Sequence, residues 1–284
     1  GTKIMTLAIY EHFRQLGAQI FYVVPNTNQY IKIFPKSQQK QFCFSTNLTV
    51  EEYITAYGFE IKNDTPNCRQ LKDAEIILQK NLPYFEHTCT DNPYTNTILE
   101  LQKIKKGVEI SQIEGLKTMI EEFEFTPEKP DSLNKDEIKY LTGGWLEELL
   151  YYKVVDQLQI DTEHIKRGLF IHRNSVVNEL DVVFIYKNKL YILEPKVSVY
   201  YHQDGKKMTT LREIVYKSDS LQDEFGLYAN WAIITLSSMR DASGNFNQLV
   251  YDHIKRAQQL GLKILGFADI STNINIKELL EIED

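Results

Sequence analysis

The sequence predicts an α/β protein made of three consecutive segments, and three observations support this fold class. Residues 139–284 show apolar patterns in the order α-β-β-β-α-β. Residues 46–138 show mainly helical periodicity. Residues 1–45 show one helix followed by two strands. The length of 284 residues suits about two domains, so we expect one complete domain, a helical connector and a smaller N-terminal unit.

The N-terminal unit, residues 1–45, has the pattern of part of a Rossmann-like domain. Its apolar residues suit a helix ending at Gly17, and strands are expected at 19–24 and 30–34, on either side of a turn. A stretch of this length is too short to close its own core. A Rossmann-like domain also places strands before such a helix, so we expect this unit to be incomplete at its N-terminus.

The connector, residues 46–138, begins with a capping box. Thr49 and Glu52 have the spacing that starts a helix, which we expect to end near Gly58. Further helices are expected at 69–80, 95–106 and 111–123. The proline-containing stretch 125–131 interrupts the periodicity and is interpreted as a linker.

The C-terminal segment, residues 139–284, has the clearest order of elements. We expect, in sequence, a helix at 144–158, strands at 167–173, 176–186 and 189–197, a helix at 207–225, a strand at 229–236, a helix at 246–260 and a short strand at 263–267.

Acidic residues occur on the two strands that form the predicted hairpin of this segment. If residues 187–188 form a two-residue turn, Asp181 faces Glu194 and Glu179 faces Lys196. Strict alternation would place all four side chains on one face. Directly opposed carboxylates repel each other, so the pattern indicates a cation between them.

Hard divalent ions such as Mg²⁺ or Mn²⁺ prefer carboxylate oxygens, and a nearby lysine can orient water or stabilise a phosphoryl centre. The other interpretation is a solvated hairpin face with one salt bridge. Three Glu-x-Lys patterns occur in the chain: Glu60/Lys62, Glu137/Lys139 and Glu194/Lys196. Only the last has an aspartate thirteen residues upstream on a predicted partner strand, which favours a site for phosphodiester chemistry there.

The helix before the hairpin adds a further acid. Glu147 falls within about 20° of Val154 and Leu158 on a helical wheel, so its carboxylate lies among apolar neighbours and needs a partner. Glu148 points about 100° away and is the weaker candidate. Each glutamate could instead be an N-terminal acid favoured by the helix dipole.

Together, these residues resemble the PD-(D/E)xK nuclease superfamily: Glu147 on a helix, Asp181 on a strand, and Glu194-Pro-Lys196 on the next. The stretches 141–148 and 178–181 resemble CRISPR-associated ancillary nucleases of type III defence, which join a CARF sensor domain to a restriction-endonuclease-like domain. The resemblance implies a nuclease for DNA, RNA or both that is activated by a cyclic oligoadenylate, typically cyclic tetra-adenylate.

The resemblance also implies roles for individual residues. The catalytic candidates are Glu147, Asp181, Glu194 and Lys196, and the candidate ligands of Mg²⁺ or Mn²⁺ are Asp181, Glu194, Glu147 and Glu179. Lys217 on the following helix could contact the substrate phosphate, although a solvated helix lysine is the interpretation that its residue type alone favours.

The N-terminus resembles the CARF motif in which a glycine-threonine-lysine turn opens a helix beside the ligand. Thr2 and Lys3 are therefore the candidate contacts to the cyclic oligoadenylate, since a helix N-terminus and a lysine suit an anionic ring. The two-fold symmetry of such a ligand implies a homodimer.

Pro195 departs from the simple hairpin, because it cannot donate a hydrogen bond to the partner strand. Either the register contains a bulge, or the ladder opens beside the acids. This proline favours one alternative, a non-catalytic sensor whose nuclease-like domain only binds nucleic acid or a partner. Another alternative is a restriction or repair endonuclease without cyclic-nucleotide control.

Composition limits the class of protein. The net charge is −7, shared as −3 before residue 141 and −4 after it, which disfavours strong sequence-independent binding of duplex DNA. The three cysteines form no CxxC pair, which is typical of a reducing, cytoplasmic setting. The sequence contains neither an apolar run of membrane-spanning length nor a secretory signal pattern, so we expect no membrane partner.

Overall fold

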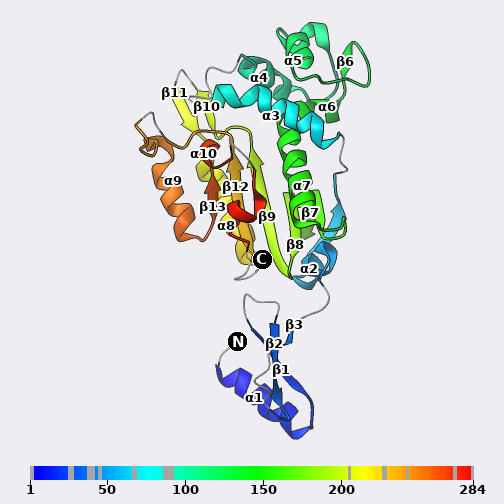
Figure 1. Cartoon of the computed structure of the whole chain (residues 1–284), viewed down its shortest axis with the longest axis vertical. Coiled ribbons are helices and arrows are strands. Elements are labelled where there is room, and N and C mark those ends of the chain that lie inside the picture. The colour runs from blue at the N-terminus through cyan, green and yellow to red at the C-terminus, as the bar shows by residue number, and fades with distance from the viewer. Residues whose placement is uncertain are drawn as a thin grey trace.

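A computed structural model of the chain describes residues 3–24, 29–36, 42–43, 47–65, 69–85, 93–203, 206–225, 229–240, 243–270 and 274–282. Figure 1 shows a large α/β body and, beyond α2, a smaller N-terminal unit. Among the described residues, no helix has the length and apolar character needed to span a bilayer.

The N-terminal unit contains one helix and a small antiparallel sheet. Its elements are α1 (Lys3–Gln15), β1 (Ile20–Val24), β2 (Gln29–Phe34) and β3 (Phe42–Cys43), and the strand order is β1-β2-β3. The predicted helix and both predicted strands are therefore confirmed. The turn expected between the strands, at 25–28, lies outside the described residues.

The large body is built on a six-stranded mixed sheet of order β13-β12-β9-β8-β7-β4. Its strands are β4 (Glu60–Asn63), β7 (Ile165–Arg173), β8 (Val176–Tyr186), β9 (Lys189–Lys196), β12 (Asn230–Thr235) and β13 (Lys263–Leu265). The pairs from β4 to β9 are antiparallel, whereas β12 runs parallel to both β9 and β13. The predicted order of elements from residue 139 onward is confirmed.

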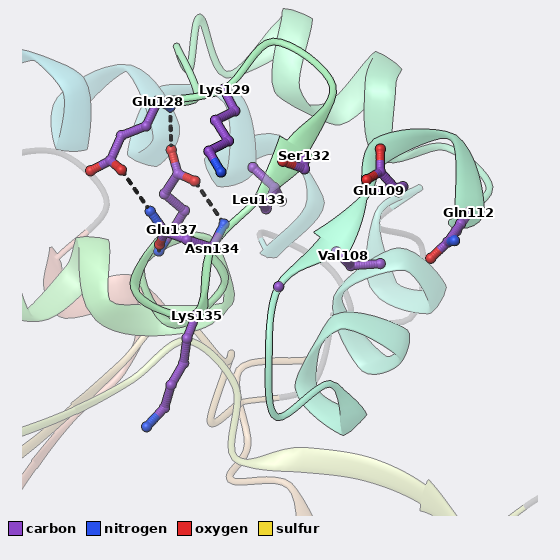
Figure 2. A pocket seen from close by; sticks show the side chains of 11 residues that line it. Val108, Glu109, Gln112, Glu128, Lys129, Ser132, Leu133, Asn134, Lys135 and Glu137 are labelled. Carbon is purple, nitrogen blue, oxygen red and sulfur yellow. Dashed lines mark hydrogen bonds between the residues drawn. The ribbon is translucent and has the colours of Figure 1, made fainter.

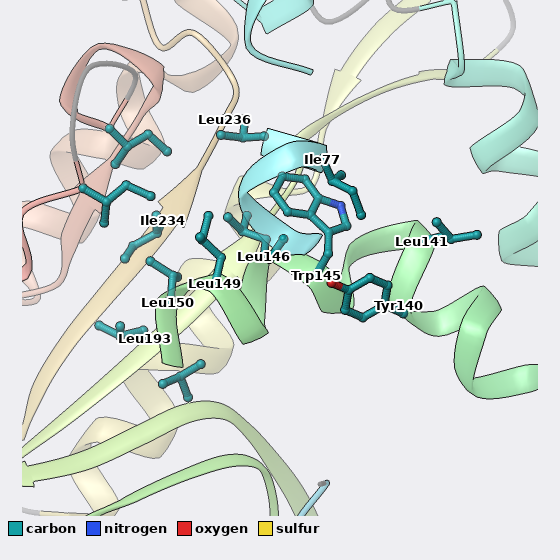
Figure 3. Packing of buried hydrophobic residues seen from close by; sticks show 14 of the residues in the cluster. Ile77, Tyr140, Leu141, Trp145, Leu146, Leu149, Leu150, Leu193, Ile234 and Leu236 are labelled. Carbon is teal, nitrogen blue, oxygen red and sulfur yellow. The ribbon is translucent and has the colours of Figure 1, made fainter. Parts of the chain in front are cut away.

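Helices cover both faces of this sheet. On one face, α7 (Trp145–Leu158) packs its Leu146, Leu149 and Leu150 side chains near Leu193 and Ile234 of the strands (Figure 3). The other face is covered by α2 (Val50–Ala56), α8 (Leu211–Glu224) and α9 (Gln248–Gln259). Burial of these apolar faces is the main force that stabilises the sheet and fixes α7 above β8 and β9.

The connector is largely helical but also contains short strands. Its remaining elements are α3 (Leu71–Phe85), α4 (Thr95–Lys103), β5 (Val108–Glu109), a 3₁₀ turn (Ile110–Gln112), α5 (Leu116–Glu122), β6 (Ser132–Leu133) and α6 (Lys135–Lys139). The predicted capping box at the start of α2 is confirmed: Thr49 Oγ1 accepts from the Glu52 N–H at 3.1 Å, and Glu52 Oε2 accepts from the Thr49 N–H at 2.8 Å.

Two expectations for the connector were too simple. The strand β4 was not predicted, yet it pairs with β7 and forms one edge of the main sheet. The stretch 125–131 is not a free linker, because Phe125 is buried, stacks on Tyr140 and lies 4.2 Å from the Arg69 guanidinium. Apolar burial therefore fastens this proline-containing segment to the body.

The remaining elements are short. They are a π-helical turn (Tyr140–Gly144) before α7, the hairpin of β10 (Tyr200–Gln203) and β11 (Lys206–Thr209), and the short helices α10 (Phe267–Ile270) and α11 (Ile276–Leu279). The hairpin was not predicted, and the helix expected from residue 207 begins at Leu211 instead.

Candidate active site

The β8–β9 hairpin forms the base of the candidate site. Its paired residues run from Tyr186↔Lys189 to Val182↔Leu193, in the predicted register. Both residues of the turn, 187–188, have positive φ angles of 50° and 59°, as a two-residue type I′ turn requires. The turn and this part of the register are therefore confirmed.

The regular pairing stops next to Asp181. The β8–β9 pairs end at Val182↔Leu193, and β9 continues beside β12, where Pro195 aligns with Ile234. Of the two interpretations of Pro195, the structure favours the opened ladder. On the other side of β8, Gly168 lies opposite Asp181 between two regular pairs and has a φ of 54°.

The strict alternation expected along β8 fails at the same place. Leu180 and Val183 belong to the same core cluster, although residues three apart on a regular strand point to opposite faces. Glu179 therefore does not pair with Lys196, which corrects the expected contact. It accepts a hydrogen bond from Lys139 Nζ at 2.9 Å instead.

Lys196 bridges the two acids of the hairpin. Its Nζ lies 2.7 Å from Asp181 Oδ2 and 3.0 Å from Glu194 Oε1. Lys217 Nζ, from α8, lies 3.4 Å from the same Glu194 oxygen. Asp181 is 6% exposed and Glu194 is 2% exposed, so these charges interact in a weakly screened environment. The fold thus brings four predicted site residues into one cluster.

Glu147 lies on α7, the helix that packs on the sheet, and its carboxylate is close enough to Asp181 for their charges to interact. Its side chain is 13% exposed, and its Oε2 lies 3.5 Å from Arg167 Nη1 on β7. Glu148 is fully buried but turned elsewhere, where it accepts from the backbone N–H of Arg69 at 3.0 Å. The preference for Glu147 over Glu148 agrees with this geometry.

The pKa values of two acids are raised in this setting. Burial, and then the negative charge of Asp181, raises the pKa of Glu147 to about 7. Burial and the charge of Glu194 raise the pKa of Asp181 to about 6, although Lys196 partly opposes the change. For Lys196, burial alone would lower the pKa, but the charges of Asp181 and Glu194 outweigh it and raise the pKa.

Sequence reasoning missed two cations of the site. Arg167 had no motif to identify it, because it meets Glu147 only through the packing of α7 on β7. Lys139 belongs to a Glu-x-Lys pattern that has no aspartate thirteen residues upstream. The chain instead brings Lys139 to Glu179, and the charges of Glu147 and Asp181 also act on it.

The carboxylates suit a divalent cation. Among the described residues, Glu147 Oε2 and Glu194 Oε2 are buried oxygens without a hydrogen-bond partner. Buried acids with open lone pairs and raised pKa values favour a bound cation. In the described part of the chain, no three metal-ligating side chains are gathered as a metal cluster. The ammonium of Lys196 is the counter-charge of Asp181 and Glu194 in this structure.

Thr2 and the side chain of Lys3, the expected contacts to an activating ligand, lie outside the described residues. A separate hollow of about 480 Å³ lies between the β5–β6 pair and α6 (Figure 2). Its buried carboxylate, Glu137, accepts from the backbone N–H groups of Glu128 and Asn134 at 2.7 and 2.9 Å. This hollow contains none of the candidate catalytic residues.

The opened hairpin with Asp181, Glu194 and Lys196, placed below a helix that carries Glu147, defines a nuclease domain of the PD-(D/E)xK, restriction-endonuclease-like class. The family comparison is more specific. The family described as Card1-like, endonuclease domain, matches residues 134–282, more than half of the chain, and the Card1 CARF domain matches residues 1–53. The chain belongs to the Card1-like endonucleases.

Several solved structures share this fold, including the following two. Protein VC1899 from Vibrio cholerae matches with a TM-score of 0.65 and 23% identity, over 99% of this chain and 72% of that one. Can2 from Sulfobacillus thermosulfidooxidans, in complex with cyclic tetra-adenylate, matches with a TM-score of 0.62 and 22% identity, over 93% and 69% of the two chains. No protein with a curated description matches the sequence.

Proposed function

We propose that this protein is a metal-dependent endonuclease, activated by a cyclic oligoadenylate, in type III CRISPR defence. The observation that carries the proposal is the buried cluster of Asp181, Glu194 and Lys196 at the opened end of the β8–β9 hairpin. We assign the sensor to residues 1–45, the connector to 46–138 and the nuclease domain to 139–284.

The metal would be held by Asp181 and Glu194, with Glu147 in support. A bound Mg²⁺ or Mn²⁺ supplies a Lewis acid for the phosphoryl oxygen and lowers the pKa of water. Two buried carboxylate oxygens of the site, Glu147 Oε2 and Glu194 Oε2, accept no hydrogen bond and suit this role. Glu179 is a weaker candidate ligand, because Lys139 already neutralises it.

Lys196 orients the attacking water and stabilises the negative charge that develops on the phosphoryl oxygens. Since its pKa is raised, it stays protonated at neutral pH and acts as a hydrogen-bond donor rather than as a proton acceptor. Lys217 lies on the rim of the same cluster with 45% of its side chain exposed. We assign it to the substrate phosphate, in DNA, RNA or both, because a solvent-accessible ammonium can reach an entering anion.

The activator assignment is supported by the CARF match at residues 1–53 and by the shared fold with Can2, whose structure holds cyclic tetra-adenylate. Thr2 and Lys3 would contact this anion at the start of α1. We further propose a cytoplasmic homodimer, because a ligand with two-fold symmetry is matched by two identical sensor surfaces.

The test is cleavage of plasmid DNA and single-stranded RNA by the full-length protein, with Mn²⁺ or EDTA and with or without cyclic tetra-adenylate. We expect cleavage only with metal, stimulation by the cyclic nucleotide, and loss of cleavage in Glu194→Gln. Undiminished cleavage in EDTA or in the variant would exclude this mechanism. Metal-dependent cleavage that ignores the cyclic nucleotide would instead favour an unregulated restriction or repair nuclease.

A further inference from the structure

Arg167 is a buried cation that the proposed reaction does not yet use. It is 4% exposed on β7, and its guanidinium faces Glu147 on α7. A buried ion pair often adds little net stability, because desolvation offsets the attraction between its charges. Stabilisation of the fold is therefore not a sufficient explanation for a buried Arg167–Glu147 ion pair beside the candidate metal site.

The backbone of Arg167 is fastened on two sides. On one side it pairs with Val182 of β8, the residue that follows Asp181. On the other side its carbonyl accepts a hydrogen bond from the Thr65 N–H at 2.9 Å. These two contacts hold the backbone of Arg167 in place next to β8, the strand that carries Asp181.

Gly168 allows the second of these contacts. Thr65 Oγ1 donates to the Gly168 carbonyl at 3.3 Å. A Cβ atom on Gly168 would lie 2.4 Å from Thr65 Oγ1, and the φ of 54° also disfavours a side chain. The segment that follows β4 can therefore lie against β7 only where the strand has a glycine.

We propose that Arg167 is a positioning residue that holds the Glu147 carboxylate toward Asp181 and so completes the metal site. A guanidinium suits this task because it is planar, permanently charged and directional. The 3.5 Å ion pair leaves Glu147 Oε2 without a hydrogen bond, so this oxygen keeps a lone pair for the cation. This inference rests on the proposed metal-dependent nuclease.

The test compares Arg167→Met and Arg167→Lys with the wild-type, full-length protein. The control is Arg173→Met on the same strand, because Arg173 pairs with Glu224 and lies over Phe59, away from the acids. The measurements are the Mn²⁺ dissociation constant by calorimetry and kcat at saturating Mn²⁺. Thermal unfolding reports the loss of stability in each variant.

We expect Arg167→Met to weaken Mn²⁺ binding about 10-fold and to lower kcat by a similar factor, the usual effect of losing a partner of a metal ligand. Simple electrostatics predicts the opposite, since removing a positive charge should tighten cation binding. Arg167→Lys should recover part of both losses. Arg173→Met should change neither constant, even if it lowers stability as much.

A second comparison keeps the proposal testable if Arg167→Met does not fold. In a Glu147→Gln background, Arg167→Lys should cause no further loss of Mn²⁺ affinity, because its effect passes through Glu147. A further loss there, or normal Mn²⁺ affinity in a folded Arg167→Met, overturns the inference. If the wild type neither binds Mn²⁺ nor cleaves, the proposed function and this inference fall together.

Discussion

At the scale of single residues, Lys196 is the side chain that separates the candidate site from an ordinary charged hairpin. Its ammonium contacts both Asp181 and Glu194. Lys196→Ala should reduce cleavage at least about 100-fold, because both the counter-charge and the donor to the reacting group disappear. The measurement is initial cleavage rate at saturating Mn²⁺, with circular dichroism to show that the fold is kept.

The chain supplies a matched control for this substitution. Lys62 belongs to a second Glu-x-Lys pattern on β4, and its side chain is exposed. Lys62→Ala should cleave at the wild-type rate. Equal rates in Lys62→Ala and Lys196→Ala would remove Lys196 from the catalytic group.

Glu147 gives a prediction about pH and stability. Its pKa is raised from a usual value near 4.5 to about 7, so the folded protein holds this proton more tightly than the unfolded chain. The resulting stability is present below about pH 4.5 and is lost as pH rises through about 7. Without metal, the wild type should therefore lose more stability between pH 5 and pH 8 than Glu147→Gln does.

The experiment is thermal unfolding in EDTA at pH 5, 6, 7 and 8. The difference between the two proteins should grow by on the order of 1–3 kcal/mol across this range, since each pKa unit corresponds to about 1.4 kcal/mol. Comparing slopes removes any constant cost of leaving Arg167 beside an uncharged residue. Parallel pH profiles for the two proteins would show that Glu147 titrates normally.

At the scale of secondary-structure elements, the irregular pairing of β7 with β8 at Gly168 lies beside the candidate site. Gly168→Ala should destabilise the protein by roughly 3 kcal/mol, because positive φ and the contact with Thr65 both oppose a side chain. Gly58→Ala is the control: its φ is 79°, but an added Cβ would meet no atom within 4 Å. It should cost only the backbone term, about 1–2 kcal/mol.

Urea unfolding of the two glycine variants measures this difference, and their Mn²⁺ affinities test its consequence. Because Gly168 lies beside Arg167 and opposite Asp181, its variant should also bind Mn²⁺ more weakly. Gly58→Ala should not. Equal stability losses in both variants would mean that the close approach of Thr65 is unimportant.

The elements also show what the sequence could predict. The hairpin turn at 187–188, the capping box at Thr49 and the order along the chain of the main helices and strands after residue 139 follow from local rules, and the structure has them. The alternation rule failed at Asp181, since it assumes that both neighbouring strands stay regular. The irregularity lies next to Asp181, whose carboxylate contacts Lys196 at 2.7 Å.

Other features depended on contacts between distant segments. The strand β4 is only four residues long and has little apolar pattern, so its pairing with β7 could not be predicted from periodicity. Arg167 and Lys139 reach the acids through helix packing and through the turn before α7. Spacing in the sequence holds no signal for contacts of this kind.

At the scale of the whole molecule, the N-terminal region is linked to the nuclease sheet through α2 and β4. Ile54 of α2 is buried in the same core cluster as Val183 and Ile192 of the sheet. After β4, the chain reaches Thr65, which hydrogen-bonds the backbone of Arg167. Packed and hydrogen-bonded groups therefore connect α2, whose residues Val50 and Tyr53 lie within the CARF match, with Arg167 beside Glu147.

This arrangement predicts that ligand binding and cleavage can be separated by substitution. Glu194→Gln should bind cyclic tetra-adenylate with wild-type affinity and fail to cleave, because it changes only the nuclease site. Lys3→Ala should weaken binding of the cyclic nucleotide about 10-fold, the scale expected for one lost charge-assisted hydrogen bond of about 1.5 kcal/mol or more. Calorimetry with the full-length protein measures both affinities.

The control for Lys3→Ala is Lys32→Ala, on β2 of the same unit, which should bind the cyclic nucleotide as the wild type does. Cleavage at saturating nucleotide should recover in Lys3→Ala, since the variant lowers the affinity for the activator and leaves the acids unchanged. A Glu194→Gln protein that no longer binds the nucleotide would indicate one shared site. Separate losses, with activation restored by excess ligand, are what a distinct sensor coupled to the sheet through β4 requires.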